Sequence, residues 1–356
     1  MRKDAPLSHR GALSNANGRF EKHAVVAFDD GWDLDDDPPP PLATTVTPDA
    51  TRTIITRNDS PDVPFDRSIN PYRGCEHGCV YCFARPSHAW LGLSPGLDFE
   101  TRLFAKPDAP RLLEAELRNP RYRPAPLAIG TNTDPYQPAE RRLRIMRGCL
   151  EVLRDFNHPV VITTKGALVT RDIDILAPMA ADGLAMVGIS VTTLDRDLCR
   201  TLEPRAATPK ARLDAIRRLS AAGIPVAVMA APVIPRVTDH ELERILEAGR
   251  EAGAGMASYI LLRLPHEVKD LFAEWLDAHV PDRARHVLSL VAQTRGGKLY
   301  DSTHGTRHTG TGQHAELLAN RFRIAFRRLG FQARSFALDC GRFRPPPRPG
   351  DQLALF

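Results

Sequence analysis

The sequence predicts an α/β fold in which six strand–helix units form an open (β/α)6 partial barrel. Between residues 65 and 265, short apolar runs of strand length alternate with segments of helical periodicity. Such alternation indicates parallel strands joined by crossover helices. The first strand is expected before Arg73, and the other five are expected at 127–129, 160–163, 186–190, 226–229 and 259–262.

Two of the intervening helices have recognisable ends. Thr208 followed by Pro209 is typical of an N-cap and a first helical position, and Gly223 supplies the left-handed residue that ends such a helix. Thr238 and Glu241 have the spacing of a capping box, which predicts the start of the next helix. These signals place a helix on each side of the strand expected at 226–229.

Four parts are expected along the chain. Residues 1–50 are acidic and proline-rich, and this composition buries too little apolar surface to fold, so it predicts a disordered tail. Residues 51–265 form the barrel core. Residues 266–340 carry apolar residues at helical spacing and predict a helical extension. The proline- and arginine-rich residues 341–356 are expected to be extended.

The composition excludes some classes of protein and permits others. The 356 residues carry a formal net charge of +5, which permits an anionic partner such as nucleic acid but does not identify one. No apolar run reaches the about 18 residues that a membrane span requires. The first residues also lack the apolar segment of a secretion signal. We therefore expect a cytoplasmic protein with no membrane partner.

Three cysteines form the most informative motif of the chain. Cys75, Cys79 and Cys82 have the spacing C-x3-C-x2-C, with the aromatic residue Tyr81 just before the last cysteine. Three thiolates from one tight loop can bind three irons of a 4Fe–4S cluster. The fourth iron then has no neighbouring cysteine and can bind a small molecule. The motif predicts a metal site of this kind.

A structural zinc site is the alternative for the same loop. Zinc requires four ligands, and the fourth would have to be His77 or His88, because no second C-x2-C pair exists. The other three cysteines are scattered singly, which is typical of small buried residues rather than of a disulfide framework. They are Cys149, Cys199 and Cys340.

The run 70–82, N-P-Y-R-G-C-E-H-G-C-V-Y-C, resembles the radical S-adenosylmethionine (SAM) superfamily, and within it the spore photoproduct lyase-like branch, often labelled "DNA repair photolyase". The resemblance covers about residues 50–350. Further matching stretches are 131–137, 164–165, 190–195 and 202–204. The motif is specific for the superfamily, whereas the other stretches indicate the branch and not a substrate.

The resemblance implies a fold, two cofactors and a reaction. Cys75, Cys79 and Cys82 would bind a 4Fe–4S cluster whose open iron binds the amino and carboxylate groups of SAM. An electron from the cluster would then cleave SAM to a 5′-deoxyadenosyl radical, with a flavodoxin or ferredoxin as reductant. Tyr81 would belong to the cofactor site. No thiol of this chain can be matched to the hydrogen-donating cysteine of the lyase, so the catalytic residues are unknown.

Polar residues follow the predicted strands at their carboxyl ends, where the active sites of α/β barrels gather. Radical SAM proteins often hold the SAM amino group with a Gly-Gly-Glu motif, which this chain lacks, so Asn132 and Asp134 are predicted to replace it. An Asx-type turn at Asp134 is the alternative, and it is compatible with that role. Lys165 is predicted to pair with the SAM carboxylate, and Ser190 to hydrogen-bond the ribose or carboxylate.

These observations predict a radical SAM enzyme that acts on DNA in a repair, lyase-like reaction. The same core acting on RNA, a peptide or a metabolite is one alternative. A non-catalytic iron–sulfur or zinc scaffold protein is another. Three arginines near the C-terminus, Arg321, Arg327 and Arg328, are expected to contact phosphate if the partner is nucleic acid.

The last five residues predict a second partner. Gln352, Leu353, Leu355 and Phe356 resemble the short peptide by which bacterial polymerases and repair proteins dock on the DNA sliding clamp. The amide would fix orientation, and the apolar side chains would enter a pocket. The preceding prolines would act as a semi-rigid spacer. The alternative is a tail that folds back onto the barrel or frays.

Overall fold

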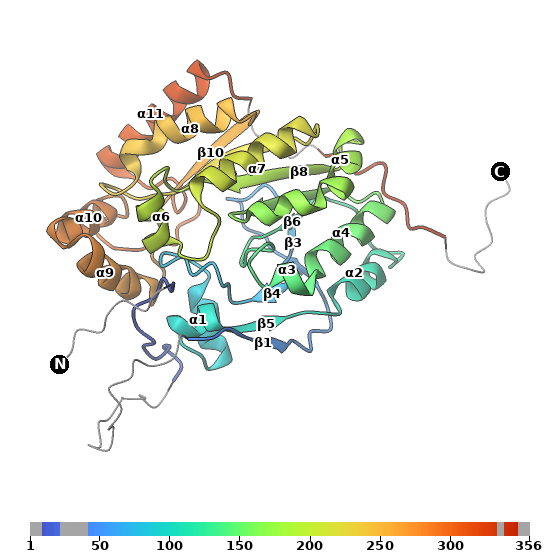
Figure 1. Cartoon of the computed structure of the whole chain (residues 1–356), viewed down its shortest axis with the longest axis horizontal. Helices are drawn as coiled ribbons and strands as arrows, with labels where there is room; N and C mark the ends of the chain where they lie inside the picture. The colour runs from blue at the N-terminus through green and yellow to red at the C-terminus, as the bar shows by residue number, and fades with distance from the viewer. Residues whose placement is uncertain (1–8, 22–41, 333–337, 348–356) are drawn as a thin grey trace.

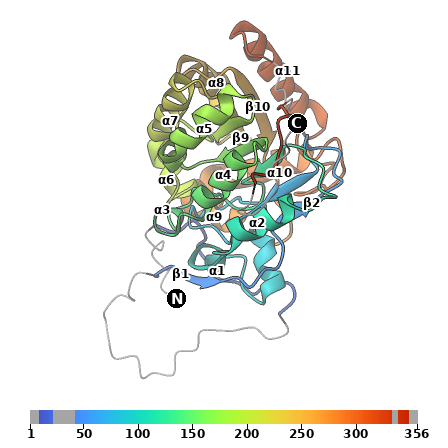
Figure 2. The same cartoon turned by 90° about the vertical axis from the view of Figure 1, so that its right-hand side faces the viewer.

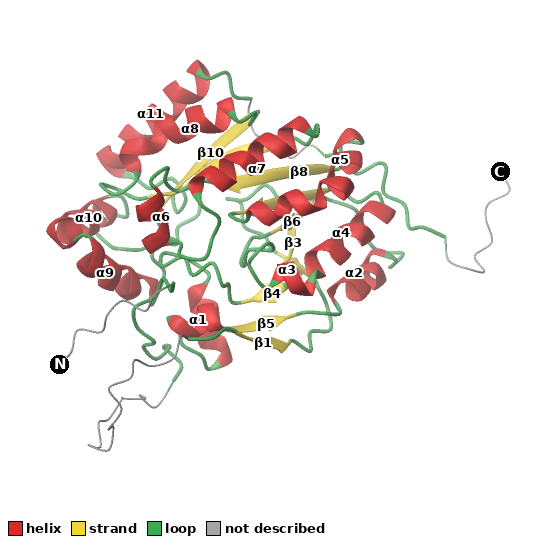
Figure 3. Cartoon of the chain, in the orientation of Figure 1, coloured by secondary structure: helices red, strands yellow, loops and turns green. Residues whose placement is uncertain are grey.

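A seven-stranded sheet and a smaller three-stranded sheet form the framework of the protein. A computed structural model describes residues 9–21, 42–332 and 338–347. In the large sheet the spatial order is β10-β9-β8-β7-β6-β3-β2, and every neighbouring pair is parallel except β2 with β3. The six parallel strands confirm the predicted open (β/α)6 architecture, since β10 and β2 lie at opposite edges of the sheet. Figure 3 shows these strands behind the helices.

The strands of the large sheet are short and largely buried. In spatial order they are β10 (Met256–Leu261), β9 (Val226–Val233), β8 (Ala185–Ser190), β7 (Val160–Thr164), β6 (Leu127–Ile129), β3 (Arg67–Ile69) and β2 (Ile55–Arg57). In β8 every residue is buried. Parallel strands covered on both faces have continuous apolar sequences of this kind.

Helices cover the outer face of the large sheet, as Figures 1 and 2 show for α4, α5, α7 and α8. The crossover helices are α2 (Ala109–Leu117), α3 (Glu140–Leu143), α4 (Ile145–Asp155), η2 (Ala167–Asp172), α5 (Ile173–Ala181), α6 (Arg196–Leu202), α7 (Pro209–Ala221), η3 (Asp239–Glu241) and α8 (Leu242–Glu251). Their apolar faces and the strands form one large core.

The smaller sheet lies at one end of the barrel (Figure 1). It has the order β1 (Thr45–Pro48), β5 (Arg102–Ala105) and β4 (Tyr72–Arg73). The helices η1 (Arg85–Leu91) and α1 (Leu97–Thr101) lie between β4 and β5 in the sequence. The cysteine motif follows β4 directly, so this sheet fixes the start of the loop that carries it.

Three helices form the C-terminal extension, namely α9 (Val268–His279), α10 (Pro281–Gln293) and α11 (Gly312–Arg328). Trp275 is fully buried, stacks on Phe272 and donates from Nε1 to the carbonyl of Thr201 (3.0 Å). Trp275 therefore has the packing role that the helical spacing of apolar residues within 266–340 predicts. Helix α11 lies on α8 (Figures 1 and 2). The domain boundaries near residues 50, 265 and 340 stay predictions.

Both predicted helix starts are found, since Thr208 precedes α7 and Thr238 precedes η3, but only Thr208 makes the predicted capping hydrogen bond. The Thr208 side chain accepts from the backbone N–H of Ala211 (3.3 Å) and caps α7. Thr238 makes no capping hydrogen bond, because its hydroxyl accepts from the backbone N–H of Ile234 (2.9 Å). The Glu241 carboxylate accepts instead from the hydroxyl of Thr193. Thr238 and Glu241 therefore each hydrogen-bond a residue of a loop outside their own helix.

The part of the N-terminal tail that the structure describes is packed. Residues 45–48 form β1, and residues 9–21 lie against the barrel, with Ala12 fully buried. Small residues such as Ala12 allow this close approach. The average composition of residues 1–50, which is acidic and proline-rich, does not indicate it. No helix within residues 9–21, 42–332 and 338–347 is long and apolar enough to cross a membrane. The clamp-like peptide at residues 352–356 lies outside the described residues.

Candidate active site

The cysteine loop, residues 74–83, meets the carboxyl ends of three parallel strands. Cys75, Cys79 and Cys82 line a hollow together with residues at or just after the carboxyl ends of β6, β7 and β8. All the predicted cofactor residues lie along this central hollow, which continues toward β9 and β10. They are Tyr81, Asn132, Asp134, Lys165 and Ser190. The fold therefore brings together side chains that are more than 100 residues apart in sequence, as strand-end reasoning predicts.

The three thiols fit the donor set of an iron–sulfur cluster. Cys75 and Cys79 are buried and Cys82 is partly buried, and burial raises the pKa of each thiol. A coordinating metal deprotonates such thiols. Among the described residues no three His, Cys, Asp or Glu side chains are grouped as ligands of a single ion. The loop presents its sulfurs along the wall of the hollow.

Lys165 brings a positive charge to the hollow. Burial would lower the pKa of its ammonium group, but Cys79 and Glu203 outweigh this and raise it, so the side chain stays charged. Its Nζ lies 5.7 Å from the centroid of the Tyr81 ring, within the range of a cation–π contact. Ser190, at the end of β8, is buried and lines the same wall. A carboxylate bound in the hollow could contact both the Lys165 ammonium and the Ser190 hydroxyl.

Asp134 holds loops together and has little capacity left for a ligand. One carboxylate oxygen accepts from the Thr164 hydroxyl (2.6 Å) and the Tyr136 N–H (2.9 Å). The other accepts from the Lys165 N–H (2.7 Å) and lies 3.3 Å from Nδ1 of His77. Burial opposes ionisation, but the charge of His77 and these hydrogen bonds lower the pKa of Asp134. The Asx-type turn is therefore present, and the carboxylate joins the cysteine loop to β7.

The residues around Asp134 also hold the cysteine loop. Asn70 accepts from the backbone N–H of Asn132 (2.9 Å). Gln137 is fully buried, accepts from the N–H of Glu76 (2.9 Å) and donates to the carbonyl of Gly74 (3.2 Å). The side chain of Asn132 itself lines the hollow. Both predicted substitutes for the Gly-Gly-Glu motif, Asn132 and Asp134, therefore line the hollow, and their roles toward SAM stay predictions.

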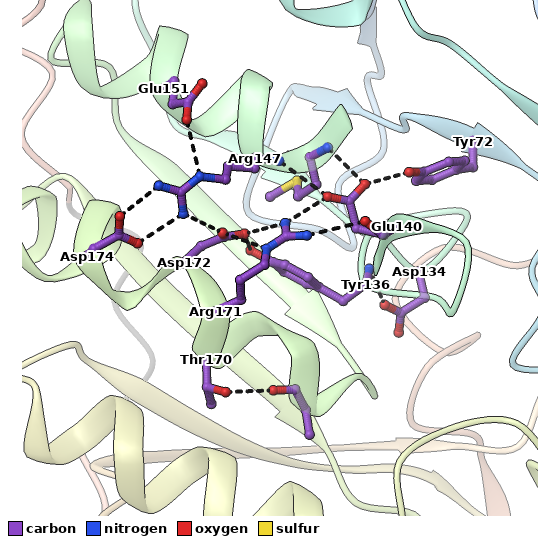
Figure 4. Close-up of polar contacts among 12 residues, drawn as sticks. Tyr72, Asp134, Tyr136, Glu140, Arg147, Glu151, Thr170, Arg171, Asp172 and Asp174 are labelled. Atoms are coloured by element: carbon purple, nitrogen blue, oxygen red, sulfur yellow. Dashed lines mark hydrogen bonds and ion pairs between the residues drawn. The ribbon is translucent and has the colours of Figure 1, made fainter. Parts of the chain in front are cut away.

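A second buried network of charged side chains lies next to Tyr72 and to the loop that carries Asp134 (Figure 4). Glu140 and Asp172 are fully buried, the guanidinium of Arg171 pairs with both, and the guanidinium of Arg147 pairs with Asp172. The Glu140 carboxylate also accepts from the hydroxyl of Tyr72 (2.5 Å), just before the cysteine loop. Paired, fully hydrogen-bonded charges hold a unique arrangement, because a misplaced partner would leave a charge unpaired.

Sequence reasoning missed the buried pair beneath Tyr81. Glu203 follows α6 and accepts from the hydroxyls of Tyr81 and Thr192 and from the guanidinium of Arg212. Burial would raise the pKa of Glu203, but Arg212, then Lys165, lower it to about 2. Arg212 also donates to the carbonyl of Ser190 (3.0 Å). No spacing signal links Glu203 to Arg212, although Glu203 lies within 202–204, one of the stretches that match the family.

The hollow widens toward β9 and β10. Its wall there is apolar and includes Met229, Ala231 and Pro232. Phe83 is 46% exposed, and the guanidinium of Arg263 lies 5.1 Å from the centroid of its ring. The part of the hollow beside the end of β9 is therefore bordered by apolar side chains. The exposed aromatic ring and its arginine were not foreseen.

The remaining thiols differ in their surroundings. Cys149 is fully buried in α4 and fits the structural role expected of it. Cys199 is also buried, and its thiol donates to the Glu203 carboxylate (3.7 Å). Cys340 is only partly buried. None of the three lines the central hollow.

The arginines of α11 lie away from the hollow. Arg321 is held by Glu243 (2.6 Å) and Arg328 by Glu247, both on α8. Arg327 is exposed. Two of the three cations expected at phosphate are therefore already neutralised by neighbouring carboxylates.

Comparisons with known proteins identify the family. The model of the radical SAM superfamily matches residues 69–249, slightly more than half of the chain. The chain belongs to the radical SAM superfamily. The cysteine loop lies within the matched residues, and the family implies SAM and an iron–sulfur cluster as cofactors.

Relatives in sequence carry no assigned reaction. Proteins Rv2578c of Mycobacterium tuberculosis and Mb2609c of Mycobacterium bovis are each 40% identical to the chain over 222 residues, which cover 62% of this chain and 65% of theirs. The protein MJ0683 of Methanocaldococcus jannaschii is 26% identical over 173 residues, with 49% and 62% covered. All three are described as uncharacterized proteins, and the match spans less than two thirds of their length.

Solved structures of spore photoproduct lyase share the fold. One of them, with bound AdoMet and a dinucleoside spore photoproduct, superposes with a TM-score of 0.58 over 81% of this chain and 80% of its own, at 15% identity. Another, in complex with a dinucleoside spore photoproduct, gives a TM-score of 0.56 at 17% identity. At this identity the likeness concerns the fold.

Proposed function

We propose that the protein uses a 4Fe–4S cluster, bound by Cys75, Cys79 and Cys82, to cleave SAM to a 5′-deoxyadenosyl radical. The observation that carries this proposal is the single hollow that three cysteines share with the strand ends after β6, β7 and β8. When bound, the cluster and SAM supply the electron and the radical. The protein supplies binding, orientation and the exclusion of water.

Named side chains would hold SAM in the hollow. Lys165 carries a charge that pairs with the SAM carboxylate, and Ser190 offers a hydroxyl beside it. Asn132 offers an amide oxygen to the amino group. The apolar residues of β9 would cover the adenine. Asp134 acts indirectly, because its hydrogen bonds fix the backbone of Lys165 and the position of His77.

Anaerobic purification tests this proposal. The protein should contain iron and acid-labile sulfide, and Cys79→Ala should lose both. With a strong reductant and SAM, the parent should form 5′-deoxyadenosine. A matched control is Cys149→Ala, since Cys149 lies in α4 away from the hollow and should leave the iron content unchanged. Stoichiometric zinc without sulfide would instead favour the scaffold alternative.

We propose DNA as the substrate class, with a lyase-like repair reaction. The lyase structure that shares the fold is solved with a dinucleoside photoproduct. In this chain Phe83 offers an exposed ring at the end of the hollow, and aromatic rings stack on nucleobases. Arg263 lies over that ring, and its buried Nε has no hydrogen-bond partner in the described part of the chain.

The charges around Arg263 favour an anionic ligand. Burial, followed by the charge of Arg263, lowers the pKa of Arg295 to about 10 and the pKa of His308 to about 4. The second cause of both shifts places Arg295 and His308 in the positive field of Arg263. A phosphodiester would supply the missing negative charge. An RNA, peptide or metabolite substrate is the outcome if DNA does not bind at low salt.

Two partners complete the proposal. A flavodoxin or ferredoxin in the cytoplasm would deliver the electron. Gln352, Leu353, Leu355 and Phe356 would bind the bacterial DNA sliding clamp and bring the enzyme to replicating or damaged DNA. The basis for the clamp is the resemblance of this peptide and its proline-rich spacer.

A further inference from the structure

The N-terminal residues pack directly against the region of the cysteine loop. Residues 10–19, which we call the N-terminal strap, lie beside α1 (Figure 1). Ala12 is fully buried and packs against α1 and α9. At the other end of the strap, Arg19 pairs with Glu267 at the start of α9 (2.9 Å). The strap is thus fixed to α1 and to α9.

A buried carboxylate joins the strap to the barrel. Glu100 of α1 is fully buried and accepts from the backbone N–H groups of Gly11 (3.0 Å) and Ala12 (2.8 Å). It also accepts from the guanidinium of Arg85 (2.5 Å). The Arg10 side chain donates to the backbone carbonyl of Glu100 (3.2 Å). Two of these three donors to the buried carboxylate therefore belong to the strap.

The same carboxylate orients an arginine that holds the cysteine loop. Arg85 is fully buried and donates to the carbonyls of Gly78 (3.0 Å) and Cys79 (2.9 Å). It donates further to the carbonyl of Gly96 (2.8 Å). The planar guanidinium fixes the relative positions of the groups that it binds. Any shift of Glu100 would be transmitted through Arg85 to the backbone at Cys79.

The strap also contacts the cysteine loop without an intermediary. A Cβ atom added to Gly11 would lie 1.8 Å from the carbonyl oxygen of Gly78. Gly78 has a φ of +67° and lies in the turn in which its N–H donates to the carbonyl of Cys75 (3.3 Å). Only a glycine at position 11 leaves room for this turn. The two segments are therefore in close contact between the first two cysteines of the motif.

We propose that the N-terminal strap is part of the cluster site, because it fixes the turn between Cys75 and Cys79 and so determines how firmly the cluster is retained. This inference rests on the cluster proposed above. Arg85 and Glu100 are positioning residues in it. Thermodynamic linkage makes the effect mutual, so cluster binding also stabilises the strap.

The first test is Gly11→Ala, with Gly255→Ala as its matched control. A Cβ at Gly255 would meet no atom within 4 Å. Both proteins are loaded with iron and sulfide anaerobically, and the loss of cluster absorbance to an iron chelator is timed. We expect Gly11→Ala to lose its cluster about tenfold faster, which corresponds to ~1.4 kcal/mol, with an altered electron paramagnetic resonance spectrum of the reduced cluster. Equal rates and spectra in the two variants overturn the inference.

The second test uses the unmodified protein, so it holds even if Gly11→Ala fails to fold. Hydrogen exchange is measured with and without the cluster. We expect the N–H groups of Gly11 and Ala12 to exchange several-fold more slowly in the loaded protein, while helix α11 serves as the internal control. Equal exchange in both states overturns the inference. A parent that binds no iron and sulfide refutes the proposed function itself, and the strap inference with it.

Discussion

Replacing Glu203 by glutamine should destabilise the protein by ~3–4 kcal/mol at pH 7. The carboxylate is 1% exposed and binds the Arg212 guanidinium, which is equally buried. Removing one partner of a buried pair leaves the other charge uncompensated, at a cost of about 3–5 kcal/mol. Tyr81 and Thr192 would also lose a charged acceptor. The variant keeps the shape of the side chain, so the loss reports on charge.

The pH dependence of this difference follows from the pKa of Glu203. Folding lowers that pKa from 4.5 to about 2. A carboxyl whose pKa is lowered on folding stabilises the native state above its unfolded pKa, and this contribution is lost as the pH falls through the folded value. The parent should therefore lose ~1.4 kcal/mol of its advantage for each pH unit between about 4.5 and 2.

Urea unfolding at pH 7, 5 and 3.5 would measure the difference in free energy of unfolding between the parent and Glu203→Gln. Bound metal is first removed with a chelator, so that an acid-labile cluster does not contribute. Glu151→Gln is the control, because Glu151 is 46% exposed and pairs with Arg147 at the surface. It should cost less than ~1 kcal/mol at any pH. A Glu203→Gln difference under ~1 kcal/mol at pH 7, or one that stays constant from pH 5 to 3.5, would refute the reasoning.

Three further predictions concern ligands and partners. Lys165→Ala and Ser190→Ala should each weaken SAM binding by about tenfold, which corresponds to ~1.4 kcal/mol, and should leave the iron content unchanged. Equilibrium dialysis would measure the affinity for SAM. If both variants bind SAM as tightly as the parent, the roles assigned to these residues are wrong. Arg263→Gln should lower DNA affinity and reduce the slope of log affinity against log salt by about 1, whereas Arg321→Gln, already paired with a carboxylate, should alter neither. A form that ends at Gly350 should lose binding to the bacterial sliding clamp in surface plasmon resonance; equal binding with and without the peptide, or none by either form, would count against a clamp partner.

The sequence predicts the architecture well because its signals are local and repetitive. Each of the six expected strands is present, and the N-cap at Thr208 is confirmed. The family assignment follows from the cysteine spacing, and the matched residues 69–249 agree with it. The capping box at Thr238 and Glu241 fails because both side chains bond to residues that are not their helical neighbours. A three-residue spacing cannot show which of two competing partners a side chain will select.

By itself, the sequence determined the order of strands and helices, the superfamily and the set of residues around the central hollow. Only the tertiary structure decided what several of them do. The Asp134 carboxylate accepts hydrogen bonds that connect two loops. Glu203 and Arg212 form a buried ion pair. Glu100 connects the N-terminal strap to the cysteine loop. Periodicity and motif spacing describe residues that are close along the chain. A buried charge is instead satisfied by whichever donors the fold brings near, and the Tyr81 hydroxyl that donates to Glu203 is 122 residues away.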